Sequence, residues 1–81
     1  MLTRNEIRSW LDRGLRTGAT HMLVVCDTFS YEDFPVFVKV GENSRDVVVK
    51  YDGVNMQTVQ EVYDLSKDID EQLEAHRVWN L

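Results

Sequence analysis

The chain is poor in the residues that mark disulfide-stabilised, membrane-spanning and phosphate-binding proteins. Its 81 residues include one cysteine, which cannot form an internal disulfide, whereas small domains in oxidising compartments usually carry several. Its longest apolar run, Met22–Cys26, is far shorter than the roughly 20 residues that span a bilayer. It has four glycines and no glycine-rich loop followed by Lys-Ser or Lys-Thr, which excludes a P-loop. We therefore expect a cytoplasmic protein in a reducing setting that does not bind a membrane.

Residues with catalytic or metal-binding chemistry are also few. His21 and His76 lie far apart in the sequence and lack zinc-ligand spacing, so packing or edge positions suit them better. Cys26 ends an apolar run, and its neighbour Asp27 disfavours the thiolate that a nucleophilic cysteine needs. We therefore expect no enzyme activity, no metal and no cofactor.

Charge is unevenly distributed along the chain. The formal net charge is −5, yet residues 1–20 carry four arginines against two acidic residues. Residues 21–81 carry five basic and twelve acidic residues. Nucleic-acid affinity comes mainly from Lys and Arg that neutralise phosphates, so this balance predicts no nucleic-acid binding unless the first helix acts alone.

The first segment of the chain predicts a helix. Thr3 and Glu6 have the spacing of a capping box. Gly14 or Gly18 would end the helix, because glycine readily takes the left-handed conformation after a last turn. We expect Trp10 to be a core residue that joins the helix to the sheet. The apolar stripe, at helical spacing, consists of Ile7, Trp10, Leu11 and Leu15.

Two strands are predicted next. The runs Met22–Cys26 and Val36–Val40 are short, rich in valine and bounded by turn-forming residues, which is typical of two adjacent antiparallel strands. Pro35 would lie at or just before the first residue of the second strand, one of the few sheet positions that proline tolerates. A polar and aromatic hinge, Asp27–Phe34, separates the two runs.

Residues 44–54 fit either a strand or a helix. Three consecutive valines favour a strand, yet the apolar residues also fall at helical spacing. We favour a short helix, because Ser44 would then be its N-cap and Gly53 the residue just past its C-terminus.

The last third of the chain predicts a strand and a helix. The strand covers roughly residues 57–65, and Asp68 and Glu71 give the helix the acidic first turn that its dipole favours. The order is therefore α-β-β-α-β-α, and helices must cover at least one face of the sheet. We predict one α+β domain over residues 1–81, with a three-stranded, mainly antiparallel sheet packed with helices. The stripe of the final helix is Ile69, Leu73 and His76, with Trp79 near its end.

The hinge is the predicted functional surface. It carries three carboxylates and three aromatics at a strand junction, and interfaces usually combine anchors and charges in this way. The carboxylates also suit magnesium or calcium, but they lack the regular alternation of an EF-hand loop. The structural alternative is a solvated turn in which Asp27 hydrogen-bonds the backbone. The predicted partner-binding residues are Asp27, Phe29, Tyr31, Glu32, Asp33 and Phe34.

Four segments together form a distinctive pattern: GATHM at residues 18–22, VVCDTF at 24–29, YEDFPV at 31–36 and VYDLS at 62–66. This pattern, which covers most of the chain, resembles a group of small uncharacterised proteins of bacteriophages and prophages. The resemblance brings no activity and no catalytic residues. It implies a context, because small phage accessory proteins often act stoichiometrically on host machinery, including defence systems.

Two functions from different classes fit these expectations. The first is a non-catalytic accessory protein that binds a host protein and inhibits or modulates host machinery or defence. Its acidic surface would match a basic site on the partner, which adds on-rate and specificity. The alternative is a homo-oligomeric sponge for a small nucleotide-like ligand, in which Arg4 and Arg8 of paired first helices bind phosphate. We place an enzyme that uses the hinge carboxylates third.

Overall fold

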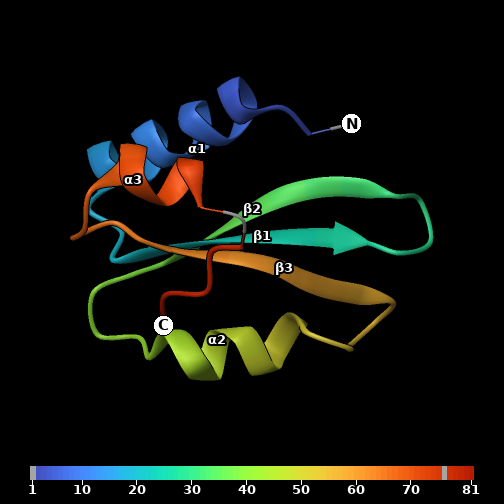
Figure 1. The fold of residues 1–81 in the computed structure, drawn as a ribbon. Coiled ribbons are helices and arrows are strands. Elements are labelled where there is room, and N and C mark those ends of the chain that lie inside the picture. The colour runs from blue at the N-terminus through green and yellow to red at the C-terminus, as the bar shows by residue number, and fades with distance from the viewer. Residues whose placement is uncertain (1, 76) are drawn as a thin grey trace.

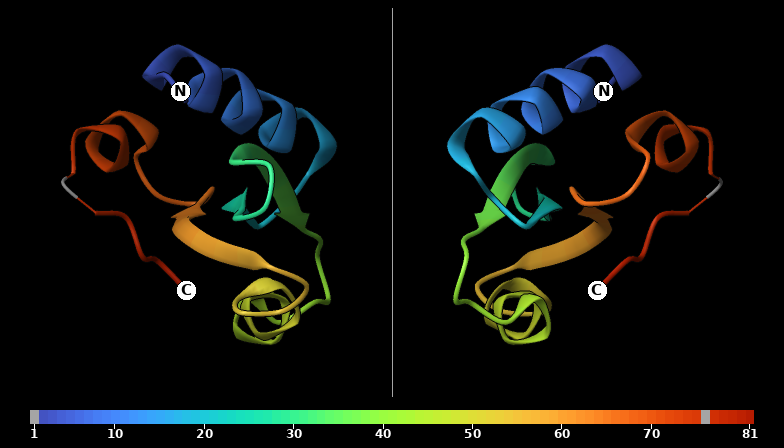
Figure 2. Two further views of the ribbon diagram at one scale, coloured as in Figure 1. Left: turned by 90° about the vertical axis from the view of Figure 1, so that its right-hand side faces the viewer. Right: turned by 90° about the vertical axis from the view of Figure 1, so that its left-hand side faces the viewer.

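A three-stranded antiparallel sheet lies between two layers of helices (Figures 1 and 2). The computed structural model describes residues 2–75 and 77–81. The strand order is β2-β1-β3, so the first strand is the central one. The predicted α+β class, element order and antiparallel sheet are confirmed. The elements are α1 (Arg4–Thr17), β1 (His21–Asp27), β2 (Glu32–Val38), α2 (Ser44–Tyr51), β3 (Gln57–Asp64) and α3 (Ile69–Glu74).

The central strand β1 is buried on both faces, which explains why its sequence is apolar throughout rather than alternating. Met22 and Val24 belong to the core cluster beneath α1 and α3. Leu23 and Val25 point to the opposite face and belong to the cluster above α2. Successive strand residues face opposite sides, so a sheet covered by helices on both sides needs apolar residues at every central position.

Helix α1 begins as its sequence predicts and ends at the second of the two candidate glycines. Thr3 is the N-cap and accepts a hydrogen bond from the Glu6 backbone N–H at 3.2 Å. Gly18 follows the helix with φ 77°, the left-handed conformation that favours glycine. Gly14 lies inside the helix, where a Cβ would approach Leu65 Cδ1 to 2.9 Å and Phe37 Cε1 to 3.0 Å. Glycine at position 14 therefore lets the sheet pack closely against α1.

Residues 44–51 form a helix, as favoured, but the residue that caps it differs from the prediction. The Asn43 side-chain oxygen accepts hydrogen bonds from the backbone N–H groups of Arg45 (2.9 Å) and Asp46 (3.3 Å). Ser44 is instead the first helical residue, and its buried hydroxyl donates to the carbonyl oxygen of Leu81 at 3.2 Å. Asn43 takes the cap because asparagine caps at least as well as serine and frees Ser44 for this contact.

Strand β2 starts four residues earlier than predicted, at Glu32, and ends at Val38 rather than at Val40. Its hairpin with β1 closes at the pair Asp27–Glu32, so the last three residues of the predicted hinge belong to β2. Pro35 consequently lies in the middle of β2, opposite Val24, and not at its start. Proline is tolerated there because β2 is an edge strand, where a missing N–H can face away from the sheet.

The C-terminal residues form a short extended segment that runs parallel to β3. Helix α3 begins after Asp68, whose side chain accepts from the Glu71 N–H at 3.1 Å. Beyond it, the Val62 N–H donates to the carbonyl of Val78, and the Asn80 N–H donates to the carbonyl of Val62, both at 2.9 Å. Trp79 therefore lies outside the final helix, and His76 falls outside the described residues. Among the described residues, this segment covers the β3 edge and leaves the β2 edge open.

We expect Leu11 to stabilise the fold far more than Leu15, although both lie on α1. Leu11 is fully buried, whereas 48% of Leu15 is exposed. Leu11→Ala should lower the free energy of unfolding by about 2–5 kcal/mol, the range for buried leucines, and Leu15→Ala by less than about 1 kcal/mol. Urea unfolding of both variants measures this difference. Similar losses for the two would show that α1 packs through another face.

Candidate protein-binding surface

The β1–β2 turn is a rigid four-residue loop built around Asp27. The Asp27 backbone carbonyl accepts from the Tyr31 N–H at 2.7 Å. Its side-chain Oδ1 accepts from the N–H groups of Phe29 at 2.8 Å and Ser30 at 3.3 Å. Asp27 thus holds the turn, as the structural alternative foresaw, and its carboxylate is occupied by backbone donors. We therefore assign Asp27 a positioning role for the residues that follow it.

The loop between α2 and β3 lies directly against this turn. The backbone carbonyl of Met56 accepts from Thr28 twice, from its N–H at 2.7 Å and from its hydroxyl at 2.6 Å. Figure 1 shows both loops at the same end of the sheet, to the right of the view. Two segments that are distant in sequence therefore form one continuous surface.

Strained backbone is concentrated in these two loops. Tyr31, Asn55 and Met56 have φ values of 59°, 53° and 60°, and within residues 2–75 and 77–81 no other non-glycine residue is left-handed. Each such conformation costs on the order of 1 kcal/mol or more for a residue with a Cβ, least for asparagine. Conformations of this kind persist where surrounding contacts impose them, and they cluster at functional sites.

The two loops expose three large apolar side chains. Phe29 is 77% exposed, Tyr31 80% and Met56 59%. Aromatic residues and methionine are enriched at protein interfaces, whereas a folded core would gain from burying them. Beside Tyr31 lie the carboxylates of Glu32, of Asp33 and, from the first turn of α1, of Glu6. We call Phe29, Tyr31 and Met56, with the carboxylates of Glu6, Glu32 and Asp33, the tip surface.

A shallow hollow of about 280 Å³ opens in the tip surface. The start of α1 forms one side through Leu2 and Glu6, and β2 with its preceding turn forms the other. Among the described residues, Asp33 Oδ1 is buried without a hydrogen-bond partner, and none of the three hollow carboxylates forms an ion pair. The hollow is lined by Leu2, Glu6, Tyr31, Glu32 and Asp33.

The structure divides the six predicted residues into three groups. Tyr31, Glu32 and Asp33 come together around the hollow, and Phe29 projects from the same turn. Asp27 supports the turn from within. Phe34 points to the other face of the sheet, where it packs against the core cluster above α2. It is separated because neighbouring strand residues face opposite sides, and the early start of β2 places this residue within the strand.

Sequence reasoning missed Leu2, Glu6 and Met56. Glu6 is predicted only as part of the capping box. Its backbone N–H donates to the Thr3 hydroxyl oxygen at 3.2 Å, its Oε1 accepts from that hydroxyl at 3.3 Å, and the residue also lines the hollow. Met56 directly precedes the strand predicted over roughly residues 57–65, and no binding role is predicted for it. The nearest signal for its loop was Gly53, which has φ 75° and marks the turn out of α2.

Cys26 lies next to this surface but does not have the chemistry of a nucleophile. It is buried on β1, opposite Asp33 of β2. Burial raises the pKa of its thiol, and the carboxylate of Asp33 raises it further. Catalytic cysteines need the opposite shift, which positive neighbours supply.

The alternative phosphate site on α1 is occupied by acidic side chains of α3. Arg8 forms an ion pair with Asp70, which raises the pKa of the guanidinium through their hydrogen bond and opposite charges. Arg4 lies in the same hollow of about 390 Å³, together with Asp70 and Glu74. A phosphate ligand would have to displace Asp70 and approach a second carboxylate, which disfavours binding here.

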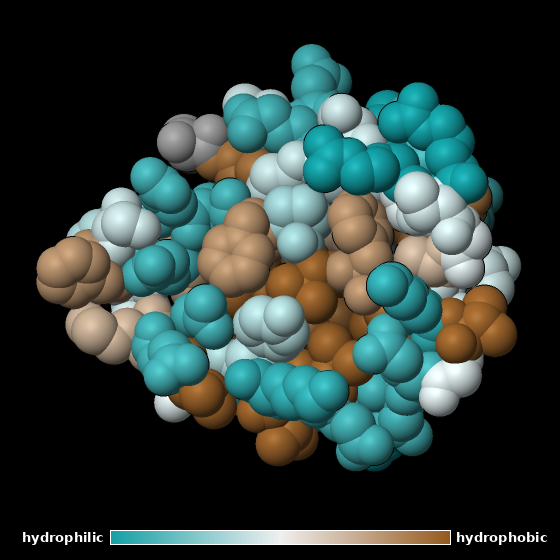
Figure 3. All heavy atoms as spheres, turned by 180° about the vertical axis from the view of Figure 1, so that it is seen from behind, coloured by the Kyte–Doolittle hydropathy of each residue, from teal (hydrophilic) through white to brown (hydrophobic). Residues whose placement is uncertain are grey.

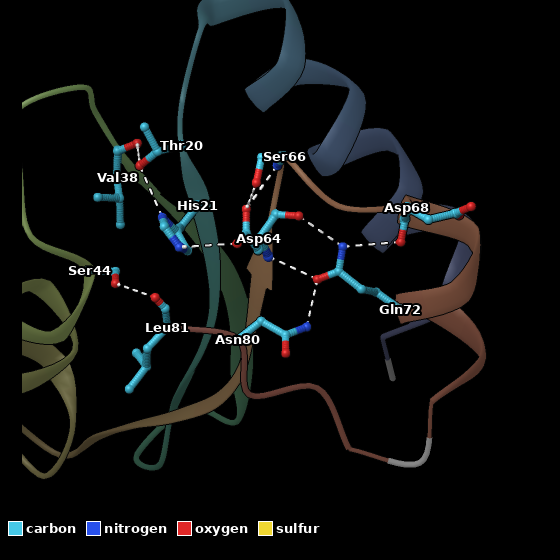
Figure 4. A network of polar contacts seen from close by, with 10 residues as sticks. All are labelled: Thr20, His21, Val38, Ser44, Asp64, Ser66, Asp68, Gln72, Asn80 and Leu81. Atoms are coloured by element: carbon cyan, nitrogen blue, oxygen red, sulfur yellow. Dashed lines mark hydrogen bonds and ion pairs between the residues drawn. The ribbon is translucent and has the colours of Figure 1, made fainter.

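A polar network at the opposite end of the sheet joins β3, α3 and the C-terminal segment (Figure 4). The Gln72 side chain is at its centre. Its Oε1 accepts from the Asp64 N–H and from Asn80 Nδ2, both at 2.9 Å, and its Nε2 donates to the Asp64 carbonyl at 2.8 Å. The oxygen and the nitrogen of the buried amide both have hydrogen-bond partners, so this Gln72 network holds β3, α3 and the C-terminal segment together.

Asp64 connects the Gln72 network to β1. Its Oδ1 accepts from the Ser66 hydroxyl at 2.6 Å and from the Ser66 N–H at 2.9 Å, and its Oδ2 lies 3.9 Å from His21 Nε2. Burial alone would raise the pKa of Asp64, but the two bonds from Ser66, with His21 and Lys67, outweigh it and lower the pKa. On its other side, His21 Nδ1 lies 3.0 Å from the Thr20 hydroxyl, which donates to the Val38 carbonyl at 3.3 Å.

Comparison with protein-family models, with curated proteins and with solved structures yields no match for this chain. Within residues 2–75 and 77–81, no helix has the length and apolar character needed to cross a membrane. The same described residues contain no group of three or more His, Cys, Asp or Glu side chains arranged to hold a metal ion.

We expect the Cys26 thiol to react slowly with Ellman's reagent at neutral pH in the native protein. Burial and the raised pKa both reduce the concentration of accessible thiolate. Asp33→Asn removes a charge that opposes the thiolate, so this variant should react faster while remaining folded. Guanidine-unfolded protein is the control for full reactivity. A native thiol that reacts as fast as the unfolded one would contradict the burial of Cys26.

We expect Asp64 to stabilise the fold at neutral pH and to lose this effect in acid. Its folded pKa is lowered, so the stabilisation is present above the ordinary carboxyl pKa of about 3.9 and is lost as the pH falls through the folded value. Ser66→Ala removes a hydrogen bond to the carboxylate, which should move acid unfolding to higher pH. Circular dichroism across an acid titration measures the midpoint, with the exposed Ser9→Ala as control. Equal midpoints would argue against this role.

Proposed function

We propose that this protein is a non-catalytic binding protein whose tip surface engages a partner protein of a bacterial host. The exposed Phe29, Tyr31 and Met56 support this proposal, because these side chains stay in solvent on loops that hydrogen bonds hold rigid. A rigid loop loses little conformational entropy on binding, so exposed anchors on it can contribute most of their burial to affinity. The protein would act stoichiometrically, by covering a site that the host needs.

The charge of the tip surface indicates the chemistry of the partner. Glu6, Glu32 and Asp33 are free of ion pairs within the described chain and line the hollow beside Tyr31. A complementary site would offer an apolar pocket bordered by Lys or Arg. Basic sites of this kind bind nucleic acid in many host proteins, so occupation by an acidic tip would block that binding.

The test is a comparison of tagged variants in pull-downs from host lysate, analysed by mass spectrometry. Phe29→Ala combined with Tyr31→Ala removes two anchors from exposed positions, so the fold should be unchanged. Val49→Ala is the matched control, because Val49 is 71% exposed on α2 and outside the tip surface. We expect one protein to be retained by the parent and the control and lost with the double variant.

Calorimetry with the purified partner then measures the contribution of each feature. Removal of both aromatic anchors should weaken binding by at least about 2 kcal/mol, as hot-spot residues do. Glu32→Lys should slow association and reduce its dependence on salt, because rim charges act mainly on the on-rate. A partner that binds the double variant at full strength would move the site away from the tip surface.

A further inference from the structure

No strand among the described residues pairs with the outer edge of β2. On the other side of the sheet, the segment around Val78 and Asn80 covers the edge of β3. Beyond β2 there is no such cover within residues 2–75 and 77–81. Figure 2 shows β2 at one side of the sheet, between α1 above and α2 below. An open edge of this length pairs readily with another strand unless its sequence prevents it.

Hydrogen bonds at the end of β2 show which backbone groups face outward. The carbonyl of Val38 accepts from the Thr20 N–H at 2.8 Å, so it points toward β1. Because the direction alternates along an antiparallel strand, Asp33, Pro35 and Phe37 direct their backbone groups away from the sheet. Pro35 has no N–H, which leaves the centre of the edge with an acceptor and no donor. Any antiparallel strand that covers Pro35 therefore lacks one hydrogen bond at this position.

Apolar side chains accompany the open edge on both faces. Phe34, Val36 and Phe37 are only partly buried. A hollow of about 480 Å³ lies beside Phe37, where Val40 and the residues that end α1 line it. Viewed from this side, brown apolar surface is open between teal hydrophilic side chains (Figure 3). Val40 is 80% exposed although it is among the most apolar residues of the chain.

Opposite charges lie at the two ends of β2. Glu32 and Asp33 begin the strand, and Lys39 follows its last residue, with its backbone N–H donating to the Glu42 carboxylate at 2.8 Å. Six residues of extended chain separate Asp33 from Lys39, roughly 20 Å, so the two cannot pair within one molecule. An antiparallel copy of the strand would bring each acidic end against a basic end.

We propose that β2 pairs with β2 of a second copy of this chain about a two-fold axis at Val36, giving a six-stranded sheet. In this register the Phe37 N–H of each copy donates to the Pro35 carbonyl of the other. Asp33 then lies opposite Lys39 on the face that carries α1. The Phe37 carbonyl of each copy stays unpaired, because Pro35 opposite it has no N–H. A two-fold axis at Pro35 would lose the same number of bonds, would place two prolines opposite each other and would set Asp33 opposite Phe37 rather than Lys39.

The register also accounts for the apolar residues of the edge. On the face that carries α2, Val36 meets its own copy and Phe34 meets Val38. On the opposite face, Phe37 packs against Pro35 and reaches toward the hollow beside Val40. Cross-strand pairs of this kind and opposite charges directly across a strand junction are both stabilising. A seven-residue strand offers less area than the roughly 800 Å² per partner of a standard interface, so we expect dissociation in the micromolar range.

The dimer engages one of the three carboxylates of the tip surface, Asp33, and leaves its exposed aromatic side chains free. The strands run in opposite directions, so the two tip surfaces lie at opposite ends of the joined sheet, with Phe29 and Tyr31 still exposed. Two such surfaces on one dimer would raise the avidity for a partner that carries more than one copy of the binding site. The dimer does not depend on the host partner and is tested without it.

Sedimentation equilibrium of the purified chain over a range of concentrations is the first test. We expect a monomer–dimer equilibrium in the micromolar range. Asp33→Lys and Lys39→Asp should each weaken the dimer by about tenfold or more, because each places two like-charge pairs in the interface. The double variant Asp33→Lys, Lys39→Asp should recover the parent affinity, since both pairs are then restored with exchanged signs. Lys50→Asp on α2 is the charge-reversal control.

Cysteine crosslinking tests the register itself. In a Cys26→Ser background, Val36→Cys places two thiols at the two-fold axis, where facing Cα atoms of a non-hydrogen-bonded pair lie about 4.5 Å apart. We expect rapid disulfide-linked dimers from this variant and none from Gln60→Cys, which lies on β3. Circular dichroism confirms that each variant is folded. A chain that stays monomeric at every concentration, a charge exchange without recovery, or equal crosslinking at Gln60 would each overturn the proposal.

Discussion

Burial of β1 between two helical layers is the constraint on which the rest of the structure depends. The strand contributes Met22 and Val24 to one core cluster and Leu23 and Val25 to the other, so both clusters share one backbone. Neither layer of helices can be removed without exposing half of the central strand. In a domain of 81 residues the core is thin, and this shared strand lets two small clusters stabilise each other.

The same constraint determines where functional groups can be placed. With both faces of the sheet covered, the parts of the sheet left for recognition are the ends of its strands and the open edge. The tip surface occupies one end, where hydrogen bonds from Thr28 to Met56 join two loops. The Gln72 network occupies the other end, where it joins β3, α3 and the C-terminal segment. Strained backbone lies at the first end alone among the described residues, which agrees with a surface organised for binding.

Most of the fold was predictable because local signals agreed with the tertiary structure. The capping box at Thr3, the left-handed Gly18 and the valine-rich runs each led to the correct element. The extent of β2 was not predictable, since Pro35 reads as a strand boundary until the strand is known to be an edge. The site was only partly predictable for a related reason. Tyr31, Glu32 and Asp33 are close in sequence, whereas Glu6 and Met56 join them through tertiary contacts that no local pattern records.

Strand β2 connects the two proposed surfaces through Asp33. Its side chain lines the acidic hollow of the tip surface, while its backbone faces the open edge. An acidic group at this position repels a second acidic end, so it disfavours parallel pairing of two copies and favours the antiparallel arrangement with Lys39. Pro35 weakens pairing along this edge, because it offers no N–H to a neighbouring strand. An edge limited in this way can join one copy of itself without extending into a fibre, since a closed two-fold pair leaves no further open β2 edge.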